Sequence, residues 1–312
     1  MPIDPQIEIL LRQLAAEGGP APESRTVAEN RAAGRALATL AGAAEPVADV
    51  LDTTAPAGDL EIPVRIYRPV TEPDAGPLPV TLYFHGGGWV FGDLDTQDHI
   101  ARTVAGRSGT IVISVDYRLA PEHRFPAAID DAYAVLTWVA DNAARLGGDG
   151  ERIAVFGESA GGNLAATLAQ ESLRRGGPRI TVQVLAYPAV DRFDDSPSMY
   201  EYTTGPILSR SYLEWFWGTY LSSPDQGADP RVSPARSREL AGLPPAVIAT
   251  AEHDPLRDQG DLYARKLAEA GVAVQHFPVD GAVHGFLSFT GSVQLSRTVL
   301  NQLSDAVAAA FN

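Results

Sequence analysis

The sequence predicts an α/β fold with a mostly parallel central sheet and helices on both faces. Short apolar runs, each as long as a buried strand, recur at residues 80–84, 111–115, 153–156, 182–186 and 247–251. Segments of helical composition lie between most of these runs, at residues 98–107, 127–145, 160–174 and 259–270. Strands that alternate with helices are typical of a parallel sheet, because each crossover places a helix on one of its faces.

The segment before the first apolar run is predicted to contain two helices and a strand. Apolar residues at helical spacing within residues 7–14 predict an amphipathic helix, and the alanine-rich residues 26–40 predict a second one. Apolar and polar residues alternate over residues 62–66, which predicts a strand. Two stretches rich in glycine and proline, residues 55–59 and 72–79, are predicted to be surface loops.

Composition excludes several classes of function. The 312 residues are 45% hydrophobic, which supports a substantial core, and include no cysteine, so disulfides, cysteine-based metal sites and thiol nucleophiles are excluded. The formal net charge of −15 makes nucleic acid and anionic membranes poor partners. No apolar run approaches the roughly 20 residues that span a bilayer, and the N-terminus lacks the pattern of a signal peptide. We therefore expect a cytoplasmic protein without membrane insertion.

A serine stands between glycines directly after the predicted strand 153–156. Residues 157–161, Gly-Glu-Ser-Ala-Gly, are expected to turn sharply from that strand into the next helix. Small residues two before and two after Ser159 permit close strand–helix contact, as in the nucleophile elbow of α/β-hydrolases. A glycine-rich turn with an idle serine would have the same sequence, so this motif alone leaves both interpretations open.

Three glycines follow His85 at the end of the predicted strand 80–84. Glycines leave backbone N–H groups uncovered, and acyl transfer needs such donors where the carbonyl oxygen gains negative charge. Gly86 and Gly87, together with the N–H of Ala160, are the predicted oxyanion hole. A flexible glycine loop is the alternative; a phosphate-binding loop would need a lysine and a Ser/Thr that are missing here. His85 is predicted to brace the loop.

A serine nucleophile also needs a base and an acid that orients it. In α/β-hydrolases the acid follows a late strand and the histidine follows the last strand, in the order Ser, Asp/Glu, His. Asp254 and His284 occupy these places in the sequence, and Glu252 and Asp258 are rival carboxylates. The predicted catalytic residues are therefore Ser159, Asp254 and His284, a set that requires neither a metal nor an organic cofactor.

Residues 191–221 interrupt the alternation with a segment rich in aromatic residues, which is predicted to be helical near residues 212–221. Its rings either pack the insertion onto the body or line an apolar substrate pocket beneath a lid. Together with aromatic residues beside the motifs, the candidates for a substrate pocket are Trp89, Tyr187, Tyr212, Trp215, Phe216 and Phe286.

The motifs together resemble the hormone-sensitive lipase family of α/β-hydrolases, also called bacterial family IV esterases. The matching segments are residues 85–88, 116–122, 157–162, 254–258 and 284–286. Glu158 stands where the family more often has aspartate. The resemblance implies an α/β-hydrolase fold: residues 1–45 would be the N-terminal helical part of a cap, and residues 46–312 the catalytic domain, with a cap insertion at about residues 190–222. It also implies a structural role for residues 116–122.

The function implied is a serine carboxylesterase that hydrolyses short- to medium-chain acyl esters through an acyl-enzyme intermediate. An amidase, deacetylase or lactonase would use the same triad. A non-catalytic receptor, similar to the plant gibberellin receptors, is the alternative from another class, and the presence of His284 argues against it. The expected partner is a small-molecule ester. Proteins of this family are often dimers, so the resemblance also raises the formation of a homodimer, for which the sequence gives no independent sign.

Overall fold

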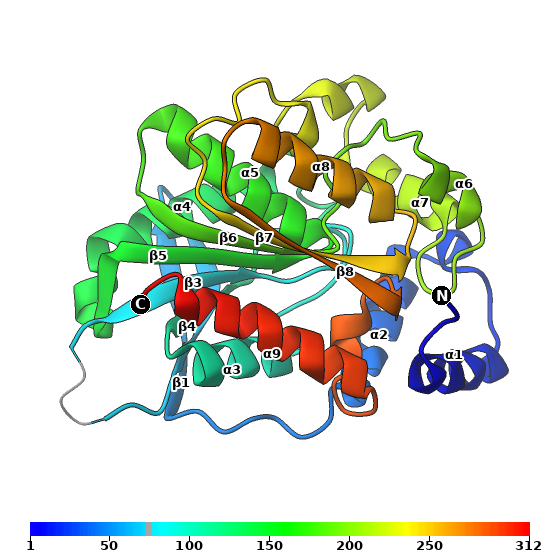
Figure 1. Cartoon of the computed structure of the whole chain (residues 1–312), viewed down its shortest axis with the longest axis horizontal. Coiled ribbons are helices and arrows are strands. Elements are labelled where there is room, and N and C mark those ends of the chain that lie inside the picture. The colour runs from blue at the N-terminus through cyan, green and yellow to red at the C-terminus, as the bar shows by residue number, and fades with distance from the viewer. Residues whose placement is uncertain (73–75) are drawn as a thin grey trace.

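The computed structural model describes residues 1–72 and 76–312, which fold around one eight-stranded sheet (Figure 1). The strand order is β1-β2-β4-β3-β5-β6-β7-β8. β1 pairs with β2, and β2 with β4, in antiparallel fashion, and all the other pairs are parallel. The strands are β1 (Asp49–Ala57), β2 (Leu60–Arg68), β3 (Leu78–Phe84), β4 (Ile111–Val115), β5 (Gly148–Glu158), β6 (Ile180–Ala186), β7 (Ala246–His253) and β8 (Val274–Val283).

Helices cover both faces of this sheet, with α3 and α9 on one face and α4, α5 and α8 on the other (Figure 1). Strand β3 shows why both faces need cover: Leu82 and Phe84 are buried in one apolar cluster, and Tyr83 is buried in the other. The α-helices are α1 (Pro5–Glu17), α2 (Val27–Leu37), α3 (Asp98–Ser108), α4 (Ala127–Asn142), α5 (Ala160–Arg175), α6 (Pro197–Glu201), α7 (Arg210–Tyr220), α8 (Arg257–Glu269) and α9 (Gln294–Ala309). The predicted fold class is confirmed.

The first edge of the sheet differs from the prediction. Residues 55–57, predicted to be loop, belong to β1, which pairs with β2 along its whole length across a turn at Gly58 and Asp59. Gly58 has φ +64°, which glycine adopts without strain. Of the predicted loop 72–79, residues 73–75 lie outside the described part of the chain, and residues 78 and 79 already belong to β3.

Helix ends also shift from the prediction. The segment predicted as one helix over residues 127–145 ends as an α-helix at Asn142 and continues as a 3₁₀ turn over Ala143–Leu146. The second predicted helix, over residues 26–40, likewise continues as a 3₁₀ helix after Leu37. Helix α9 was not predicted, although Val299, Leu303 and Val307 repeat at a spacing of four residues and are buried.

The carboxyl ends of four strands bring the sequence motifs together. β3 ends directly before His85, β5 before Ser159, β7 before Asp254 and β8 before His284. These strands all run in one direction, so their carboxyl ends meet at one edge of the sheet, where ligands bind in open α/β folds. In Figure 1, α1, α2, α6 and α7 lie at this same end of the molecule.

Helix α2 is fastened to this end of the sheet by Arg31. The guanidinium donates to the carbonyl oxygens of Val90 (2.9 Å) and Ala120 (3.0 Å), and both Nη atoms bind the carboxylate of Glu122 at 2.7 Å. The Arg31 hydrogen bond is the main reason why the pKa of Glu122 falls from 4.5 to about 2. Helix α2 is therefore tied to the segment that follows the glycine loop.

Arg31→Ala is expected to lower the free energy of unfolding by about 1–3 kcal/mol, because two buried carbonyls lose a charged donor. Glu122→Ala, which removes only the exposed end of the ion pair, is the matched control with an expected loss of about 0–1 kcal/mol. Urea unfolding at pH 7 measures both. Because the folded-state pKa of Glu122 is lowered, the contribution of the pair is present above pH 4.5 and is lost as the pH falls toward 2. Equal losses in the two variants would contradict this account.

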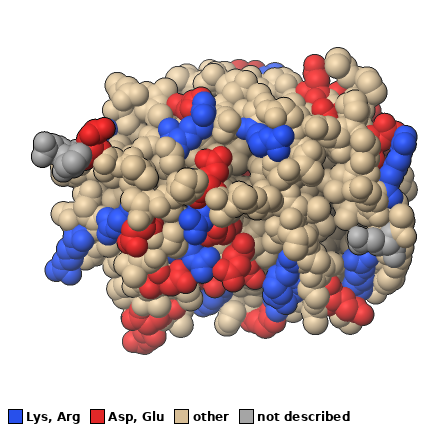
Figure 2. Space-filling view, turned by 90° about the horizontal axis from the view of Figure 1, so that it is seen from below, with Lys and Arg blue, Asp and Glu red and all other residues tan. Residues whose placement is uncertain are grey.

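Charges of both signs are interspersed on the face seen in Figure 2, where Lys and Arg side chains lie beside Asp and Glu. Such opposite charges also pair directly, since Arg65 binds Asp52 at 2.6 Å and Asp95 at 2.8 Å. The described residues of this face therefore form no continuous basic surface of the kind that nucleic acid needs. None of the helices formed by residues 1–72 and 76–312 combines the length and apolar character needed to cross a membrane.

Candidate active site

Ser159 sits in a strained turn between β5 and α5. Its φ of +56° and ψ of −119° are unusual for a residue with a side chain. The flanking glycines explain how the turn fits. A Cβ at Gly157 would lie 2.1 Å from the carbonyl oxygen of Gly161, and one at Gly161 would lie 2.0 Å from that of Phe84. The glycines thus permit the close approach that holds Ser159 at the tip of the turn.

The structure brings Ser159, His284 and Asp254 into one chain of hydrogen bonds. Ser159 Oγ lies 2.9 Å from His284 Nε2, and His284 Nδ1 lies 2.7 Å from Asp254 Oδ2. The other carboxylate oxygen of Asp254 accepts the N–H of Leu256 at 2.8 Å. Asp254 is fully buried and His284 is 8% exposed. This geometry gives a hydroxyl, a base that can remove its proton, and a fixed acid that orients the base.

The two rival carboxylates lie elsewhere. Glu252 accepts the N–H of Gly281 at 2.7 Å, and Asp258 accepts the N–H of Ser198 at 2.8 Å and binds Arg257. Both therefore tie loops and helices together, and Asp254 is the acid beside His284.

In the glycine loop, the structure differs from the prediction that Gly86 is an oxyanion donor. The N–H of Gly86 donates to Glu158 Oε1 at 2.5 Å, so it points at a carboxylate and not into the site. Gly87, Gly88 and Ala160 line the cavity at Ser159. Among the described residues, no protein acceptor takes the N–H of Gly87 or Gly88. The amides of Gly87 and Gly88, and that of Ala160 at the start of α5, are therefore available to a ligand.

His85 braces the loop, as its place in the sequence predicted. Its Nδ1 lies 2.7 Å from the carbonyl oxygen of Gly86, and its ring stacks on Tyr117 at a centroid distance of 4.3 Å. The hydroxyl of Tyr117 donates to the carbonyl oxygen of His85 at 2.8 Å. Burial lowers the pKa of His85 to about 4, so this imidazole is neutral at physiological pH. The contact from Tyr117 agrees with a structural role for residues 116–122.

An apolar cavity of about 130 Å³ opens over Ser159 and His284. Of the aromatic residues predicted to line it, Trp89, Tyr212 and Phe216 do so. Tyr212 and Phe216 are four residues apart on α7, and so lie on the same face of that helix. The other large apolar residues at the cavity, which were not predicted, are Leu37, Phe91, Ile207, Leu208, Leu213, Leu256 and Phe289.

The other three predicted pocket residues do not line this cavity. Tyr187 and Phe286 are fully buried behind it, where the ring of Tyr187 meets His284 edge-on at a centroid distance of 5.1 Å. Trp215 lies on another side of α7 and packs against Tyr212 and Phe216. Tyr187 therefore packs against the histidine, Phe286 packs against Tyr187, and Trp215 supports the rings that face the cavity.

Several cavity residues could have been found from the sequence. Leu37 lies in the N-terminal segment that the family resemblance assigned to a cap, and Ser288 and Phe289 follow His284 closely along the chain. Ile207 and Leu208 precede α7 in a stretch without a periodic pattern, so no local signal directs them inward.

Gly88→Ala is expected to lower the free energy of unfolding by about 1–3 kcal/mol through overpacking. A Cβ at Gly88 would lie 2.0 Å from the ring of Phe216, and the residue has φ +60°. Gly218 in α7 is the control, because a Cβ there would meet nothing within 4 Å and alanine favours the helix. Chemical unfolding of the two variants measures the difference. A Gly88→Ala variant as stable as Gly218→Ala would contradict the contact.

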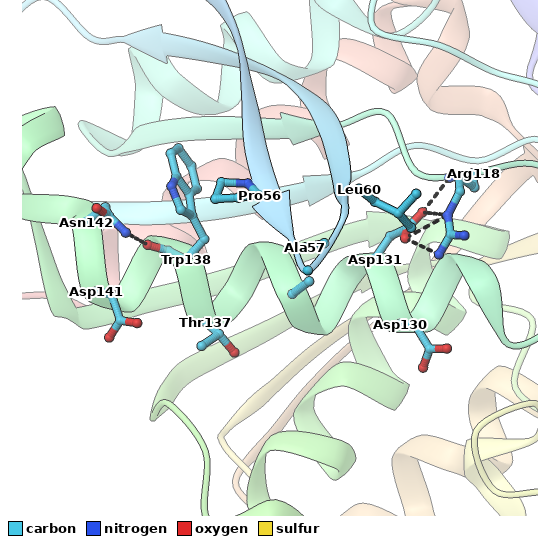
Figure 3. A pocket seen from close by; sticks show the side chains of 12 residues that line it. Pro56, Ala57, Leu60, Arg118, Asp130, Asp131, Thr137, Trp138, Asp141 and Asn142 are labelled. Atoms are coloured by element: carbon cyan, nitrogen blue, oxygen red, sulfur yellow. Dashed lines mark hydrogen bonds and ion pairs between the residues drawn. The ribbon is translucent and has the colours of Figure 1, made fainter.

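A second cavity, of about 590 Å³, lies between the β1–β2 hairpin and α4 (Figure 3). Its arginine, Arg118, is bound by the buried carboxylate of Asp131 at 2.6 Å. None of its lining residues belongs to the loops that carry Ser159, Asp254 or His284. Within the part of the chain that the structure describes, no three His, Cys, Asp or Glu side chains converge as metal ligands would.

Comparison with known proteins places this geometry in a family. A family model described as an alpha/beta hydrolase fold matches residues 81–288. The carboxylesterase NlhH of Mycobacterium tuberculosis is 48% identical over 235 residues, which cover 74% of this chain and 73% of NlhH. The carboxylic ester hydrolase LipN of the same organism is 39% identical over 315 residues, covering 98% of this chain and 83% of LipN.

A solved structure agrees over nearly the whole length. The hyperthermophilic esterase from the archaeon Pyrobaculum calidifontis superposes with a TM-score of 0.91 at 40% identity, and the match covers 99% of both chains. The chain belongs to the α/β-hydrolases, in their hormone-sensitive-lipase-like branch, bacterial family IV.

Proposed function

We propose that this chain is a serine carboxylesterase that acts through an acyl-enzyme intermediate on Ser159. The observation that carries the proposal is the continuous hydrogen-bond chain from Ser159 through His284 to Asp254, in which Ser159 and His284 line an apolar cavity. Relatives named carboxylesterase and carboxylic ester hydrolase support the same reaction class. A receptor that had lost its base would lack the contact between Ser159 and His284.

In the acylation step, His284 Nε2 takes the proton of Ser159 Oγ as that oxygen attacks the ester carbonyl. The carbonyl oxygen becomes negative and is held by the N–H groups of Gly87, Gly88 and Ala160. Asp254 keeps His284 oriented and stabilises the imidazolium that forms. The tetrahedral intermediate collapses as His284 returns its proton to the leaving alcohol.

In the deacylation step, a water molecule takes the place of the alcohol. His284 removes a proton from this water as it attacks the acyl carbonyl, and the same three amides hold the oxyanion again. Collapse of the second intermediate releases the carboxylic acid and returns the proton to Ser159. The protein residues complete this cycle without a cofactor.

The size and the apolar walls of the cavity support the proposal that the substrates carry short- to medium-chain acyl groups. Its volume of about 130 Å³ lies below the roughly 300–1,000 Å³ of pockets that enclose drug-sized ligands. Its walls from α7 and the preceding loop, such as Leu208, Tyr212 and Phe216, are apolar, so they favour an alkyl or aryl group over a charged one. Residues 190–222, with Leu37 from the N-terminal segment, act in this proposal as a cap over the cavity.

A series of p-nitrophenyl esters from acetate to palmitate tests this function. We expect kcat/KM to peak between two and eight acyl carbons and to fall steeply for longer chains. A peak at the long-chain esters would contradict the proposed substrate class, and the absence of hydrolysis of any ester would contradict the proposed reaction.

Three further properties complete the proposal. The absence of cysteine from the sequence supports a cytoplasmic location, because secreted proteins commonly rely on disulfides; recovery in the membrane or extracellular fraction would contradict it. A homodimer is proposed from the family resemblance, and sedimentation at the mass of a single chain would exclude it. The net charge of −15 supports the prediction that nucleic acid is not a partner.

A further inference from the structure

The carboxylate of Glu158 has no part in the proton transfers, yet it lies beside the nucleophile. It stands next to Ser159 at the end of β5, is 3% exposed and lines the active-site cavity. Burying a carboxylate costs free energy unless hydrogen bonds or an opposite charge compensate for the lost water. Its contacts therefore show what it does.

Those contacts join Glu158 to the first residue of the oxyanion loop. Glu158 Oε1 accepts the N–H of Gly86 at 2.5 Å. The carboxyl group also fills the space of the missing side chain, because a Cβ at Gly86 would lie 2.3 Å from Oε1 and 2.6 Å from Oε2. β3 and β5 are neighbours in register, with Phe84 opposite Gly157, so the two residues meet across adjacent strand ends.

The contact with Glu158 occupies the amide of Gly86, and the next two residues of the loop line the cavity. With the N–H of Gly86 turned to the carboxylate, the loop continues through Gly87 at φ +111° and Gly88 at φ +60°, both of which line the cavity. His85 and Tyr117 also hold the start of the loop, through the carbonyl oxygens of Gly86 and His85. Glu158 is thus the link between the loop and the elbow, one residue away from the nucleophile.

We propose that Glu158 is a positioning residue that fixes the oxyanion loop relative to Ser159 through the N–H of Gly86. This inference rests on the proposed function. Burial raises the pKa of Glu158, while the Gly86 hydrogen bond opposes the rise. The contact needs only an acceptor oxygen, which the protonated acid also supplies, so a neutral amide of the same length should replace the carboxyl group.

Three variants separate this role from a general loss of packing. Glu158→Gln keeps the length and the acceptor, whereas Glu158→Met keeps the length and removes the acceptor. We expect kcat for p-nitrophenyl butyrate to fall about 10- to 100-fold in Glu158→Met, a part of the loss caused by removing an oxyanion donor, with KM changed less than about threefold. Glu158→Gln should stay within about fivefold of the parent. Glu158→Ala replaces Glu158→Met if that variant does not fold.

The rates of inhibition by two related compounds measure how strongly the oxyanion hole donates hydrogen bonds. Diethyl p-nitrophenyl phosphate and its phosphorothionate each phosphorylate Ser159: Oγ bonds to phosphorus, His284 takes the proton and p-nitrophenolate leaves. The P=O oxygen of the phosphate accepts hydrogen bonds from the loop amides, whereas the P=S sulfur of the phosphorothionate is a weak acceptor. The oxygen-to-sulfur rate ratio should therefore fall about tenfold in Glu158→Met and remain unchanged in Glu158→Gln.

The outcomes are distinct. An oxygen-to-sulfur rate ratio that falls in Glu158→Met and is unchanged in Glu158→Gln supports the proposal. A loss of both rates by the same factor in Glu158→Met, with the ratio intact, means that Glu158 only packs, and it overturns the proposal. A ratio lost equally in Glu158→Gln overturns it as well. If neither reagent labels Ser159 in the parent enzyme, the proposed function fails, and this inference fails with it.

Discussion

Ser159→Ala is expected to lower kcat by about 10⁴- to 10⁶-fold for any p-nitrophenyl ester that the parent enzyme hydrolyses. The substitution removes the only atom that can form the acyl-enzyme in the proposed cycle, while His284, Asp254 and the backbone amides stay in place. The rate that remains should come from substrate binding and the oxyanion amides acting on water. KM should change little, because Oγ contributes to the reaction more than to binding.

The matched control is Ser288→Ala, since Ser288 lines the same cavity but lies outside the hydrogen-bond chain. Its kcat should stay within about tenfold of the parent. Near-normal hydrolysis by Ser159→Ala, or an equal loss in Ser288→Ala, would remove Ser159 from the role of nucleophile.

Asp254→Asn is expected to lower kcat by about 10⁴-fold at neutral pH, by analogy with the same change in another serine triad. One oxygen of Asp254 accepts the N–H of Leu256, so an asparagine should keep its carbonyl there and turn its NH₂ group toward His284 Nδ1. A donor at that place favours the imidazole tautomer with the proton on Nε2. That nitrogen then cannot take the proton of Ser159.

Asp258→Asn is the control for this second prediction, because it changes the rival carboxylate without touching His284. Steady-state rates at pH 7.5 should place it within about tenfold of the parent. A loss in Asp258→Asn as large as the loss in Asp254→Asn would show that the acid has been assigned to the wrong residue.

The sequence was sufficient for those features that depend on the order of motifs along the chain. Apolar runs separated by helical segments predicted the parallel sheet. Glycines around Ser159 predicted the elbow, because the backbone clash that they avoid is local to the turn. Asp254 and His284 were predictable because each follows a late strand, in the order along the chain that a serine nucleophile of this fold requires.

Features that depend on contacts between distant segments were not predictable in the same way. Gly86 was predicted to be an oxyanion donor, but its N–H is taken by Glu158, 72 residues away, through the register of β3 and β5. The pairing register of these two strands cannot be derived from the local sequence of either strand. The pocket shows the same limit: the spacing of Tyr212 and Phe216 puts both on one helix face, but which face of α7 meets the site is decided by tertiary packing.

Active-site titration with diethyl p-nitrophenyl phosphate tests whether Ser159 is the nucleophile. We expect the release of one p-nitrophenolate per chain, complete loss of esterase activity, and a diethyl phosphate adduct that peptide mass spectrometry locates on Ser159. Ser159→Ala should take up no label. An enzyme that keeps hydrolysing esters without an adduct, or that carries the adduct on another residue, would contradict the assignment of Ser159 as the nucleophile.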